Sequence, residues 1–430
     1  MEKIINPNKQ KLTEALLRPQ LEQKDLSDTV SAIFEDVKKC GDQAVKEYAQ
    51  KFDGVTLDRL LVTSEEIEIA KNQINHELKS AILRAAENIK AFHEAQKDSV
   101  TKVETFPGVF CWRKSVGIDK VGLYIPGGTA PLFSTVLMLG IPAKIANCKE
   151  VVLCTPTNAD GEINPAILYS ADLVGITKIV KLGGIQAVAA MTLGTETVPE
   201  VYKIFGPGNQ YVTAAKQYAQ QLGKAIDMPA GPSEVMVVAD NSANPQFIAA
   251  DLLSQAEHGA DSQVVFVTNE EVMLDKVASE VEKQLSDLPR KELALKSLKY
   301  AKLICVDKEN IIDVINEYAP EHLILNTAFN DELIAGITNA GSVFIGQYTP
   351  ESLGDYASGT NHTLPTNGFA KMYSGVSLDS FVKKITYQTA SADGLQKLGP
   401  VVEKMAAAEE LFAHKNAVTV RLNALKNEEN

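Results

Sequence analysis

The sequence predicts an α/β protein built on two parallel β-sheets, with a small N-terminal arm and a mostly helical C-terminal extension. Short apolar runs alternate with longer helical segments from Lys120 to Ala239 and again from Gln263 to Ile345. Helices that cover a parallel sheet produce this pattern. Glycine-rich turns follow several of the runs, and 430 residues are too many for one simple core. We therefore expect about two to four domains.

The composition narrows the class of protein further. A net charge of -13 and a pI near 5.1 argue against non-specific binding to nucleic acid or to an acidic membrane. The chain starts without a signal-peptide pattern and has no apolar run near the ~18 residues of a membrane span. The five cysteines include no C-x-x-C pair, so reduced thiols are expected. These features indicate an acidic cytoplasmic enzyme.

The first quarter of the chain is predicted to be helical. Residues 1–25 form the arm, which carries only a possible short helix. From Ser27 onward apolar residues recur at helical spacing, and Gly41 and Gly54 are predicted to end two successive helices.

A further helical region follows Gly54. Thr63 and Glu66 have the spacing of a capping box, and Leu78–Gln96 keeps the helical period. His76 and His93 lie among lysine and glutamate residues, so we expect both to be solvated. No chemistry is predicted for this region.

The first alternating region carries glycine turns that suit a dinucleotide. Its expected strands are Val121–Ile125, Glu150–Cys154, Lys178–Leu182, Lys203–Phe205 and Glu234–Ala239, after a short strand at Cys111-Trp112 whose tryptophan is predicted to be core. Turns at Pro126–Pro131, Gly183–Gln186 and Gly206–Asn209 would bring backbone N–H groups and a helix N-terminus to a pyrophosphate. None matches G-x-G-x-x-G, because Tyr211 stands where the third glycine belongs. On spacing alone, cofactor binding and plain strand-to-helix turns both remain open.

The second alternating region leads into a long loop. Strands are expected at Gln263–Thr268, Leu303–Val306, His322–Leu325 and Ser342–Ile345, then a strand at Phe381–Thr389 and helices over Leu398–Leu425. Between them Gln347–Gly368 shows neither period, and an ordered loop of that length is usually functional. It carries Asp355 and His362.

The segment Asn244–Gly259 is the clearest candidate for an inward-facing polar helix. Asn244 is a plausible N-cap before Pro245, and the helix is predicted to run to His258. Asp251, Gln255 and His258 share a face on which a metal ion could bind. Alternatively, His258 sits at the helix end because a cation is favoured there.

Histidines are scarce, and most lie beside other polar residues. Four of the six occur in the pairs Gln255/His258, Glu321/His322, Asp355/His362 and Glu409/His414. Glu409 and His414 are five residues apart and therefore do not share a helix face. A catalytic zinc site needs about three or four N/O ligands, and proton transfer needs a further histidine or carboxylate. The pairs could supply both, or the histidines could be structural.

Several motifs in order resemble the histidinol dehydrogenase family from about residue 27 to 425. They are VGLYIPGGTAP (121–131), IFGPGN (204–209), DMPAGPSE (227–234), LSQAEHG (253–259), APEH (319–322), GTNHTLP (359–365) and AHKNA (413–417). The resemblance implies a zinc- and NAD-dependent homodimer with shared active sites. It implies oxidation of L-histidinol to L-histidine through L-histidinal with two NAD, the last steps of histidine biosynthesis. It also implies two incomplete Rossmann-like domains.

The resemblance assigns site residues position by position. The zinc ligands, one ion per subunit, would be Gln255, His258, Asp355 and, from the neighbouring subunit, His414. Glu321 and His322 would be the acid/base pair. Ser233, His362 and Glu409 would contact substrate together with His322 and the zinc ligands, and Tyr124, Gln186 and Asn209 would contact NAD. Zinc would bind the substrate's imidazole and amino nitrogens and orient it.

The expected domain division follows from the same resemblance. Residues 1–25 form the arm, 26–124 with 234–378 the zinc and acid/base domain, 125–233 the NAD domain, and 379–430 an extension that reaches the partner subunit. The alternatives are a zinc hydrolase and a non-catalytic dinucleotide-binding or regulatory protein. Formation of NADH with substrate separates the dehydrogenase from the hydrolase, and the long loop with Asp355 and His362, together with a metal, argues against the non-catalytic protein.

Overall fold

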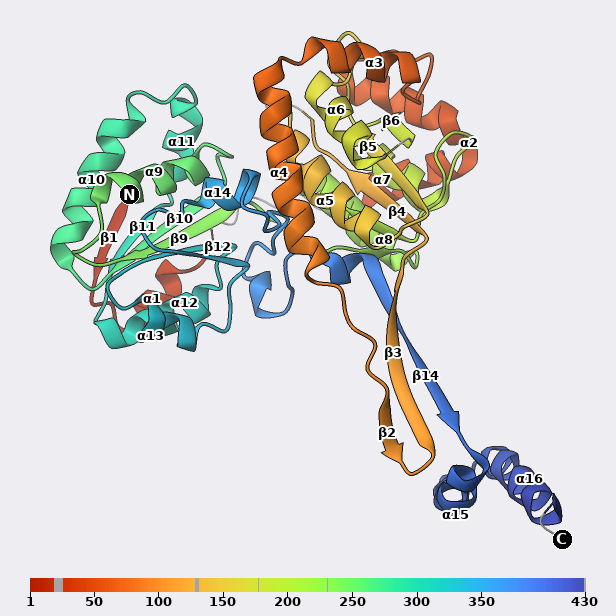
Figure 1. Ribbon diagram of the computed structural model, residues 1–430. Helices are drawn as coiled ribbons and strands as arrows, with labels where there is room; N and C mark the ends of the chain where they lie inside the picture. Colours follow the sequence, from red (N-terminus) through yellow and green to blue (C-terminus); the bar gives the residue numbers. More distant parts are fainter. Residues whose placement is uncertain (19–25, 128–130, 177, 230, 429–430) are drawn as a thin grey trace. The chain divides into compact units, whose positions relative to one another are not determined.

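The computed structural model describes residues 1–18, 26–127, 131–176, 178–229 and 231–428 (Figure 1). Its chain forms two compact units, a larger one of Met1–Ala95 with Ile118–Phe381 and a smaller one of Gln96–Gly117 with Val382–Asn430. The larger unit contains two parallel sheets, which confirms the predicted fold class. Part of the predicted arm (19–25) and of the first glycine turn (128–130) lies outside the described residues.

The five-stranded sheet has the order β6-β5-β4-β7-β8, with all pairs parallel. Its strands are β4 (Lys120–Tyr124), β5 (Glu150–Thr155), β6 (Lys178–Lys181), β7 (Lys203–Phe205) and β8 (Ala225–Ile226). Four were predicted; β8 has two residues and is too short to show a period. Counted along the chain the order is 3-2-1-4-5, the Rossmann order without its sixth strand. The sheet is therefore an incomplete Rossmann-like one, as expected.

Helices cover both faces of this sheet, because right-handed crossovers on either side of the first strand place them there. They are α5 (Phe133–Ile145), α6 (Pro165–Val174), α7 (Gly184–Leu193) and α8 (Gln210–Gln221). Outside them, α2 (Ser27–Asp53) packs on α7 and α8, α3 (Ser64–Gln73) on α6, and α4 (His76–Glu94) on α5.

The N-terminal helices begin and end largely as predicted. Gly41 breaks the helical backbone inside α2, and Gly54 ends it in the left-handed conformation. Thr63 and Glu66 form the capping box. His93 contradicts the prediction of a solvated residue, because it is fully buried with Nδ1 2.8 Å from the Ile89 carbonyl oxygen. Its spacing from the buried Ile89 places it on the apolar stripe of α4, a signal that charged sequence neighbours concealed.

The six-stranded sheet has the order β1-β11-β10-β9-β12-β13, also with all pairs parallel. Its strands are β1 (Glu2–Ile5), β9 (Glu234–Ala239), β10 (Gln263–Thr268), β11 (Lys302–Cys305), β12 (His322–Asn326) and β13 (Ser342–Ile345). The strand β9, which ended the first alternating region in the sequence, is central here. Its five strands from β9 to β13 repeat the 3-2-1-4-5 order, and β1 extends the edge. The arm thus contributes a strand that its sequence did not signal.

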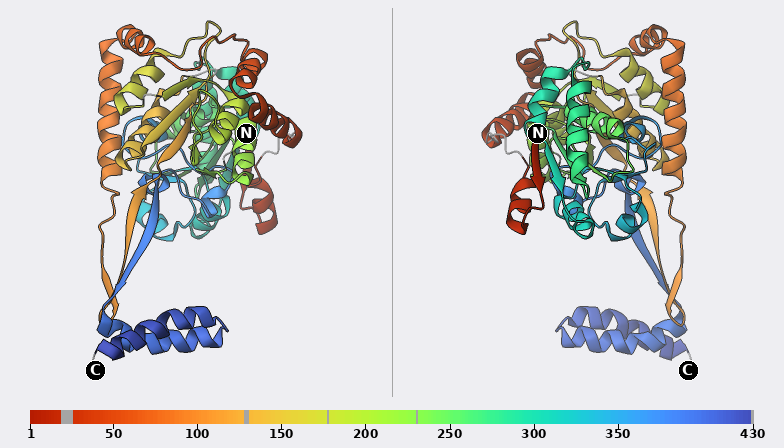
Figure 2. Two further views of the ribbon diagram at one scale, coloured as in Figure 1. Left: turned by 90° about the vertical axis from the view of Figure 1, so that its right-hand side faces the viewer. Right: turned by 90° about the vertical axis from the view of Figure 1, so that its left-hand side faces the viewer.

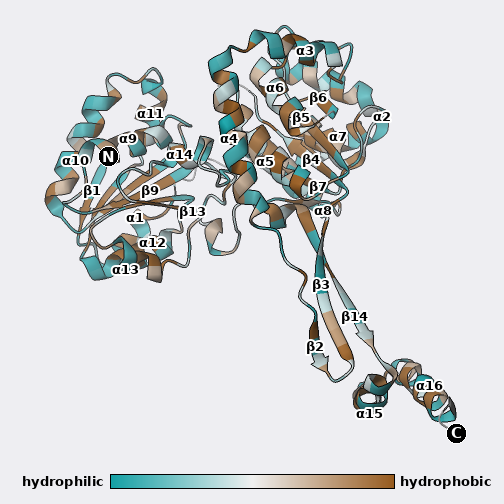
Figure 3. Ribbon diagram, viewed as in Figure 1, coloured by the Kyte–Doolittle hydropathy of each residue, from teal (hydrophilic) through white to brown (hydrophobic). Residues whose placement is uncertain are grey.

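Alternate residues of β9 supply two hydrophobic cores. Val235 and Val237 pack with α9 (Pro245–Ala256) and α10 (Glu271–Leu285), whereas Met236 and Val238 pack with α12 (Ile311–Tyr318). The remaining short helices of this unit are α1 (Lys9–Ala15), α11 (Lys291–Leu298), α13 (Asn330–Gly336), α14 (Glu351–Tyr356) and the 3-10 turns Lys308–Asn310, Phe369–Lys371 and Leu378–Phe381. A strand that is buried on both faces is largely apolar, and Figure 3 draws most of β4, β5 and β9 in brown.

The smaller unit is an antiparallel ribbon followed by two helices. Its sheet has the order β14-β3-β2, made of β2 (Val103–Phe106), β3 (Val109–Gly117) and β14 (Val382–Ala390). The helices α15 (Ala392–Ala408) and α16 (Phe412–Glu428) lie side by side (Figure 2). The strand and helices were predicted, but Trp112 is not a core residue. It is partly exposed and stacks on Tyr387 at 5.5 Å between ring centroids. Among the described residues, no helix is long and apolar enough to cross a membrane.

Candidate active site

The end of α9 presents two of the predicted ligands. The Asn244 side chain accepts a hydrogen bond from the Gln246 N–H at 3.0 Å, which confirms the N-cap. The helix ends at Ala256, so the predicted end at His258 is two residues too far. Gln255 is fully buried and neither polar atom of its side-chain amide has a hydrogen-bond partner. His258 follows the helix and is exposed.

Glu321 and His322 lie at the amino end of β12, beside the first residue of β9. The Glu234 N–H donates to Glu321 Oε2 at 2.9 Å, and the Glu234 carbonyl oxygen lies 3.3 Å from His322 Nδ1. Both side chains are nearly inaccessible to solvent. The strand begins at His322, so Glu321 is outside the pleat, and the two neighbours need not point to opposite faces. They therefore meet in one place, with His322 Nδ1 3.6 Å from Glu321 Oε2.

The expected loop Gln347–Gly368 contains the short helix α14 and is otherwise without long regular structure. The helix α14 has six residues, which are too few to show a hydrophobic period in the sequence. Glu351 and Asp355 lie four residues apart on this helix and both approach His322. Asp355 Oδ1 is 3.3 Å from Nε2, and Glu351 Oε1 is 3.8 Å from Nδ1. Sequence reasoning missed Glu351; the four-residue spacing was the available signal.

His362 connects this segment to the five-stranded sheet. Its Nδ1 lies 2.8 Å from the Asp355 carbonyl oxygen and its Nε2 lies 3.0 Å from Thr135 Oγ1 in α5. Because a carbonyl can only accept, Nδ1 carries the proton and the Thr135 hydroxyl donates to Nε2. Burial lowers the pKa of His362, which favours this neutral form.

The buried carboxyl groups of the site have divergent pKa values. Burial raises the pKa of Glu321 and of Glu351 to about 8, and that of Asp251 on α9 to about 7. For Asp355, burial is outweighed by the nearby imidazoles, chiefly His322, so its pKa is lowered. Such spreading of carboxyl pKa values is frequent at functional sites.

The two imidazoles near Asp355 shift in opposite directions. Burial alone would lower the pKa of His322, but the charges of Glu351, Glu321 and Asp355 raise it well above its usual value. The pKa of His258 is lowered, because crowding by the protein outweighs the charge of Asp355 even though solvent reaches the residue. A neutral imidazole is the form that binds a metal ion.

The site contains a donor set that fits a divalent cation. Ligand atoms of His258, Glu351 and Asp355 all lie within 4.8 Å of one another. Glu351 Oε2 and the Gln255 amide are buried without partners, and unpartnered buried polar atoms are costly unless something binds them. One imidazole with oxygen donors is a set that zinc accepts. Two predicted ligands, His258 and Asp355, thus come together.

The remaining predicted site residues occupy three places. Ser233 directly precedes β9 and is partly exposed. Glu409 caps the C-terminus of α15 and His414 lies in the first turn of α16, both exposed in the smaller unit. Tyr124 ends β4, Gln186 follows β6 and Asn209 follows β7, all at the carboxyl end of the five-stranded sheet.

Tyr124, Gln186 and Asn209 lie beside glycine turns. The Tyr124 hydroxyl accepts from the Gly184 N–H at 3.2 Å, and Asn209 caps α8 through Tyr211 N and Val212 N. Gln186 is buried with its Oε1 unpartnered. At Gly206, φ is +129° and a Cβ would collide with the Tyr124 carbonyl oxygen. This end of the sheet therefore combines a glycine turn packed closely against β4 with an unsatisfied buried acceptor, at the strand ends where dinucleotides usually bind.

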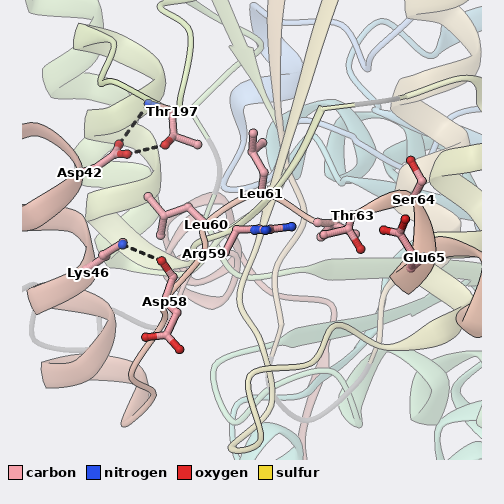
Figure 4. Close-up of a pocket in the computed structure, with 11 residues that line it drawn as sticks. Asp42, Lys46, Asp58, Arg59, Leu60, Leu61, Thr63, Ser64, Glu65 and Thr197 are labelled. Carbon is pink, nitrogen blue, oxygen red and sulfur yellow. Dashed lines mark hydrogen bonds between the residues drawn. The ribbon is translucent and has the colours of Figure 1, made fainter.

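A hollow of about 590 Å³ lies elsewhere, between α2 and the start of α3 (Figure 4). None of the predicted site residues lines it. Its polar groups are largely engaged: Asp42 accepts from Thr195 and Thr197, and Lys46 donates to the Asp58 carbonyl oxygen. We therefore assign the chemistry to the buried carboxylate–imidazole cluster rather than to this hollow.

Two incomplete Rossmann-like sheets with a metal-competent acid/base cluster define a dehydrogenase-type α/β enzyme. The chain belongs to the histidinol dehydrogenase family, whose sequence pattern matches residues 16–422. It is thus an oxidoreductase of histidine biosynthesis, as the motifs indicated, rather than a zinc hydrolase or a non-catalytic binding protein.

Individual relatives resemble the chain over its whole length. Histidinol dehydrogenase of Bacteroides thetaiotaomicron is 60% identical and covers 99% of this chain and 100% of its own. That of an Escherichia coli O6:H1 strain is 51% identical, with 96% and 95% covered. The crystal structure of the Elizabethkingia anophelis enzyme matches with a TM-score of 0.98, 56% identity and 99% of each chain covered.

Proposed function

We propose that the protein catalyses the zinc-dependent, four-electron oxidation of L-histidinol to L-histidine through L-histidinal, with two NAD. The main structural support for this proposal is one cluster of polar side chains that includes the unpartnered Gln255 amide. Its other members are His258, Glu351, Asp355, Glu321 and His322. It combines a set of metal donors with two separate proton acceptors. Oxidation of an alcohol to an acid in two stages needs both.

Zinc would be held by Gln255, His258, Asp355 and the partner subunit's His414; when bound it orients the substrate and offsets the negative charge around His322. One ion per subunit and a homodimer with shared sites follow from this ligand set. Glu351 is a further donor beside it. Ser233, His362 and Glu409 would contact the substrate.

His322 would take the hydroxyl proton in the first oxidation. A cation bound at the neighbouring donors offsets the negative charge that raises the pKa of His322 and so favours the neutral ring. Its Nδ1 faces the Glu234 carbonyl oxygen, so the neutral ring keeps its proton on Nδ1 and leaves Nε2 free as a base. Nε2 is buried and makes no hydrogen bond of good geometry, although Asp355 Oδ1 lies 3.3 Å away. The free lone pair is thus on the side of the ring next to the metal donors.

Glu321 would activate the water that the aldehyde needs before the second oxidation. Its Oε2 accepts from the Glu234 N–H, which fixes the carboxyl group beside His322. As a carboxylate it removes a proton from water, whereas as a carboxylic acid it cannot. His322 would therefore act as the base in the first oxidation, and Glu321 would activate water for the second.

NAD would bind at the glycine turns beside Tyr124, Gln186 and Asn209 and accept hydride in each oxidation. Gln186 offers an unpartnered amide oxygen beside these turns. Asn209 holds the N-terminus of α8, where the helix dipole favours a pyrophosphate.

The proposal is tested by two stoichiometries measured on one preparation. Metal analysis should give about one zinc per chain, and exhaustive turnover should give about two NADH per histidinol. Chelation should abolish turnover and added zinc should restore it. Full activity in protein shown to be metal-free, or NADH formation that stops at one equivalent, would contradict the proposal.

A further inference from the structure

The backbone of Glu234 orients both proposed proton acceptors. Its N–H donates to Glu321 Oε2 at 2.9 Å, and its carbonyl oxygen is 3.3 Å from His322 Nδ1. The first contact directs the carboxyl group, and the second determines which ring nitrogen carries the proton. These two polar groups belong to the peptide groups on either side of the Glu234 Cα, so a shift of this residue would disturb both catalytic groups together.

The side chain of the same residue is held by an arginine from the N-terminal arm. Arg18 Nε lies 2.6 Å from Glu234 Oε2 and Nη2 lies 2.8 Å from Oε1, a bidentate ion pair. Glu234 is 2% exposed and Arg18 is mostly buried. Bidentate pairing fixes the orientation of a carboxylate as well as its position.

A second set of contacts fixes the arginine itself. Arg18 Nη2 donates to the Tyr318 carbonyl oxygen at 2.7 Å, and its guanidinium lies 4.1 Å from the centroid of the Tyr318 ring. The Tyr318 hydroxyl lies 3.3 Å from Glu234 Oε2 and donates to Gln263 Oε1 at 2.9 Å. The ion pair therefore has little freedom on either side.

We propose that Arg18 is a positioning residue for the reaction: by clamping the Glu234 carboxylate, it fixes the backbone of Glu234, whose N–H and carbonyl groups orient Glu321 and His322. This inference rests on the proposed roles of those two residues. Arg18 acts without touching substrate, metal or cofactor. Replacing it leaves a carboxylate buried without its cation, and relief of that cost requires Glu234 to move or to take a proton.

The test uses Arg18→Gln in the zinc-loaded enzyme, with single-turnover NADH traces from histidinol and from supplied histidinal. Both rates, counted per zinc-loaded site, should fall about 10- to 100-fold, as expected for small displacements of catalytic groups. The dissociation constant of histidinol and the zinc content should be unchanged. A purely structural role would lower the melting temperature but leave the rate per loaded site intact.

Matched variants separate positioning from general damage. Lys3 lies in the same N-terminal segment and pairs with Asp275, and neither residue belongs to the clamp. Lys3→Gln should therefore leave both rates unchanged. Arg18→Lys keeps the charge but not the bidentate geometry and should give an intermediate loss. Glu234→Gln should reproduce the loss, and its combination with Arg18→Gln should cost less than the two losses multiplied together.

Clear outcomes would overturn the inference. The positioning role is excluded if Arg18→Gln turns over as fast as Lys3→Gln. If Arg18→Gln does not fold, normal rates in Arg18→Lys and Glu234→Gln exclude it instead. Glu321→Gln and His322→Asn are measured in the same assay. If those two also turn over normally, the proposed roles fail; if they lose turnover while the Arg18 and Glu234 variants do not, only the positioning role fails.

Discussion

At the scale of single residues, burial rather than residue type sets the chemistry of Glu321 and His322. Both are ordinary titratable groups in the sequence, yet the same enclosed surroundings raise the pKa of the carboxyl group and, through its charged neighbours, that of the imidazole. The backbone of Glu234 gives one group a hydrogen-bond donor and the other an acceptor. Distinct roles at adjacent positions are therefore physically reasonable.

The first prediction separates these roles by step. Glu321→Gln should slow oxidation of supplied histidinal far more than the first hydride transfer from histidinol, because only the aldehyde requires water activation. His322→Asn should impair both steps. Single-turnover NADH traces with each substrate provide the measurement, with zinc content and folding checked for each variant. Equal losses at the two steps in the Glu321 variant would refute the division.

The second prediction concerns the pH dependence of the second step. Burial raises the pKa of Glu321 to about 8, although the charge of His322 and the Glu234 hydrogen bond lower it. The carboxylate fraction therefore grows as pH rises, so histidinal oxidation should accelerate from pH 6 through the midpoint and level off about one pH unit above it. A cation near Asp355 offsets one of the charges that raise this pKa and moves the midpoint down, not up. A rate that falls over this range, or one whose profile Glu321→Gln leaves unaltered, would contradict the assignment.

At the scale of elements, the proposed contacts lie at opposite strand ends in the two sheets. In open α/β sheets, ligands usually bind at the carboxyl ends of the strands, and the proposed NAD contacts beside the turns after β4, β6 and β7 agree with that rule. The proposed site residues of the other sheet do not: Ser233 precedes β9, and Glu321 precedes β12. The hydrogen bond between His362 and Thr135 of α5 joins the segment after α14 to the helix that follows β4 of the five-stranded sheet.

A buried ion pair secures one of the glycine turns. Lys216 of α8 pairs with Asp227 and donates to the Gly206 carbonyl oxygen at 2.9 Å, while Asp227 accepts from the Gly206 N–H at 2.8 Å. Both side chains are nearly inaccessible. The pair thus grips both polar groups of Gly206, next to the predicted NAD contact Asn209.

The third prediction tests that grip. Lys216→Met leaves Asp227 buried and uncompensated, so the free energy of unfolding should fall by about 3 kcal/mol or more. The KM for NAD should rise while zinc content stays constant. Denaturant unfolding and initial rates at varied NAD measure the two effects. Lys224→Met, which removes the pairing with the exposed Glu200, is the control and should change neither appreciably. An unchanged KM for NAD in Lys216→Met would separate the pair from the cofactor site.

At the scale of the whole molecule, the proposed site residues are divided between the two compact units. The proposed ligands His258 and Asp355 belong to the larger unit, whereas the proposed ligand His414 and the proposed substrate contact Glu409 belong to the smaller one and are exposed. Their proposed place is the site of a partner subunit, which would make each site a product of two chains.

The fourth prediction tests this sharing. Mixed dimers of His258→Ala and His414→Ala chains should recover about half of the sites, because one of the two shared sites then has an intact ligand set. Zinc bound per dimer and turnover are measured on heterodimers purified with two different tags. Each homodimeric variant serves as the inactive reference. If verified heterodimers show no recovery, His414 acts within its own chain.

The sequence by itself determined the fold class, most strands and the caps. Apolar runs, glycine turns and side-chain spacing act locally, so β13 falls on its predicted residues, Gly41 breaks α2 and Asn244 caps α9. It failed where local signals were short or misleading: β1 and β8 show no period, and His93 was judged by its charged neighbours rather than by its helical stripe.

Only the tertiary structure decided which polar residues meet. The motifs indicated Glu321, His322, Asp355 and His258 separately, but their assembly depends on parallel strands, which bring residues distant in sequence to one edge. Glu351 joined them because α14 turns it toward His322. The clamp of Arg18 on Glu234 spans 216 residues, and no periodicity encodes such a contact. Burial then set the pKa values, since desolvation depends on the surrounding atoms and not on sequence neighbours.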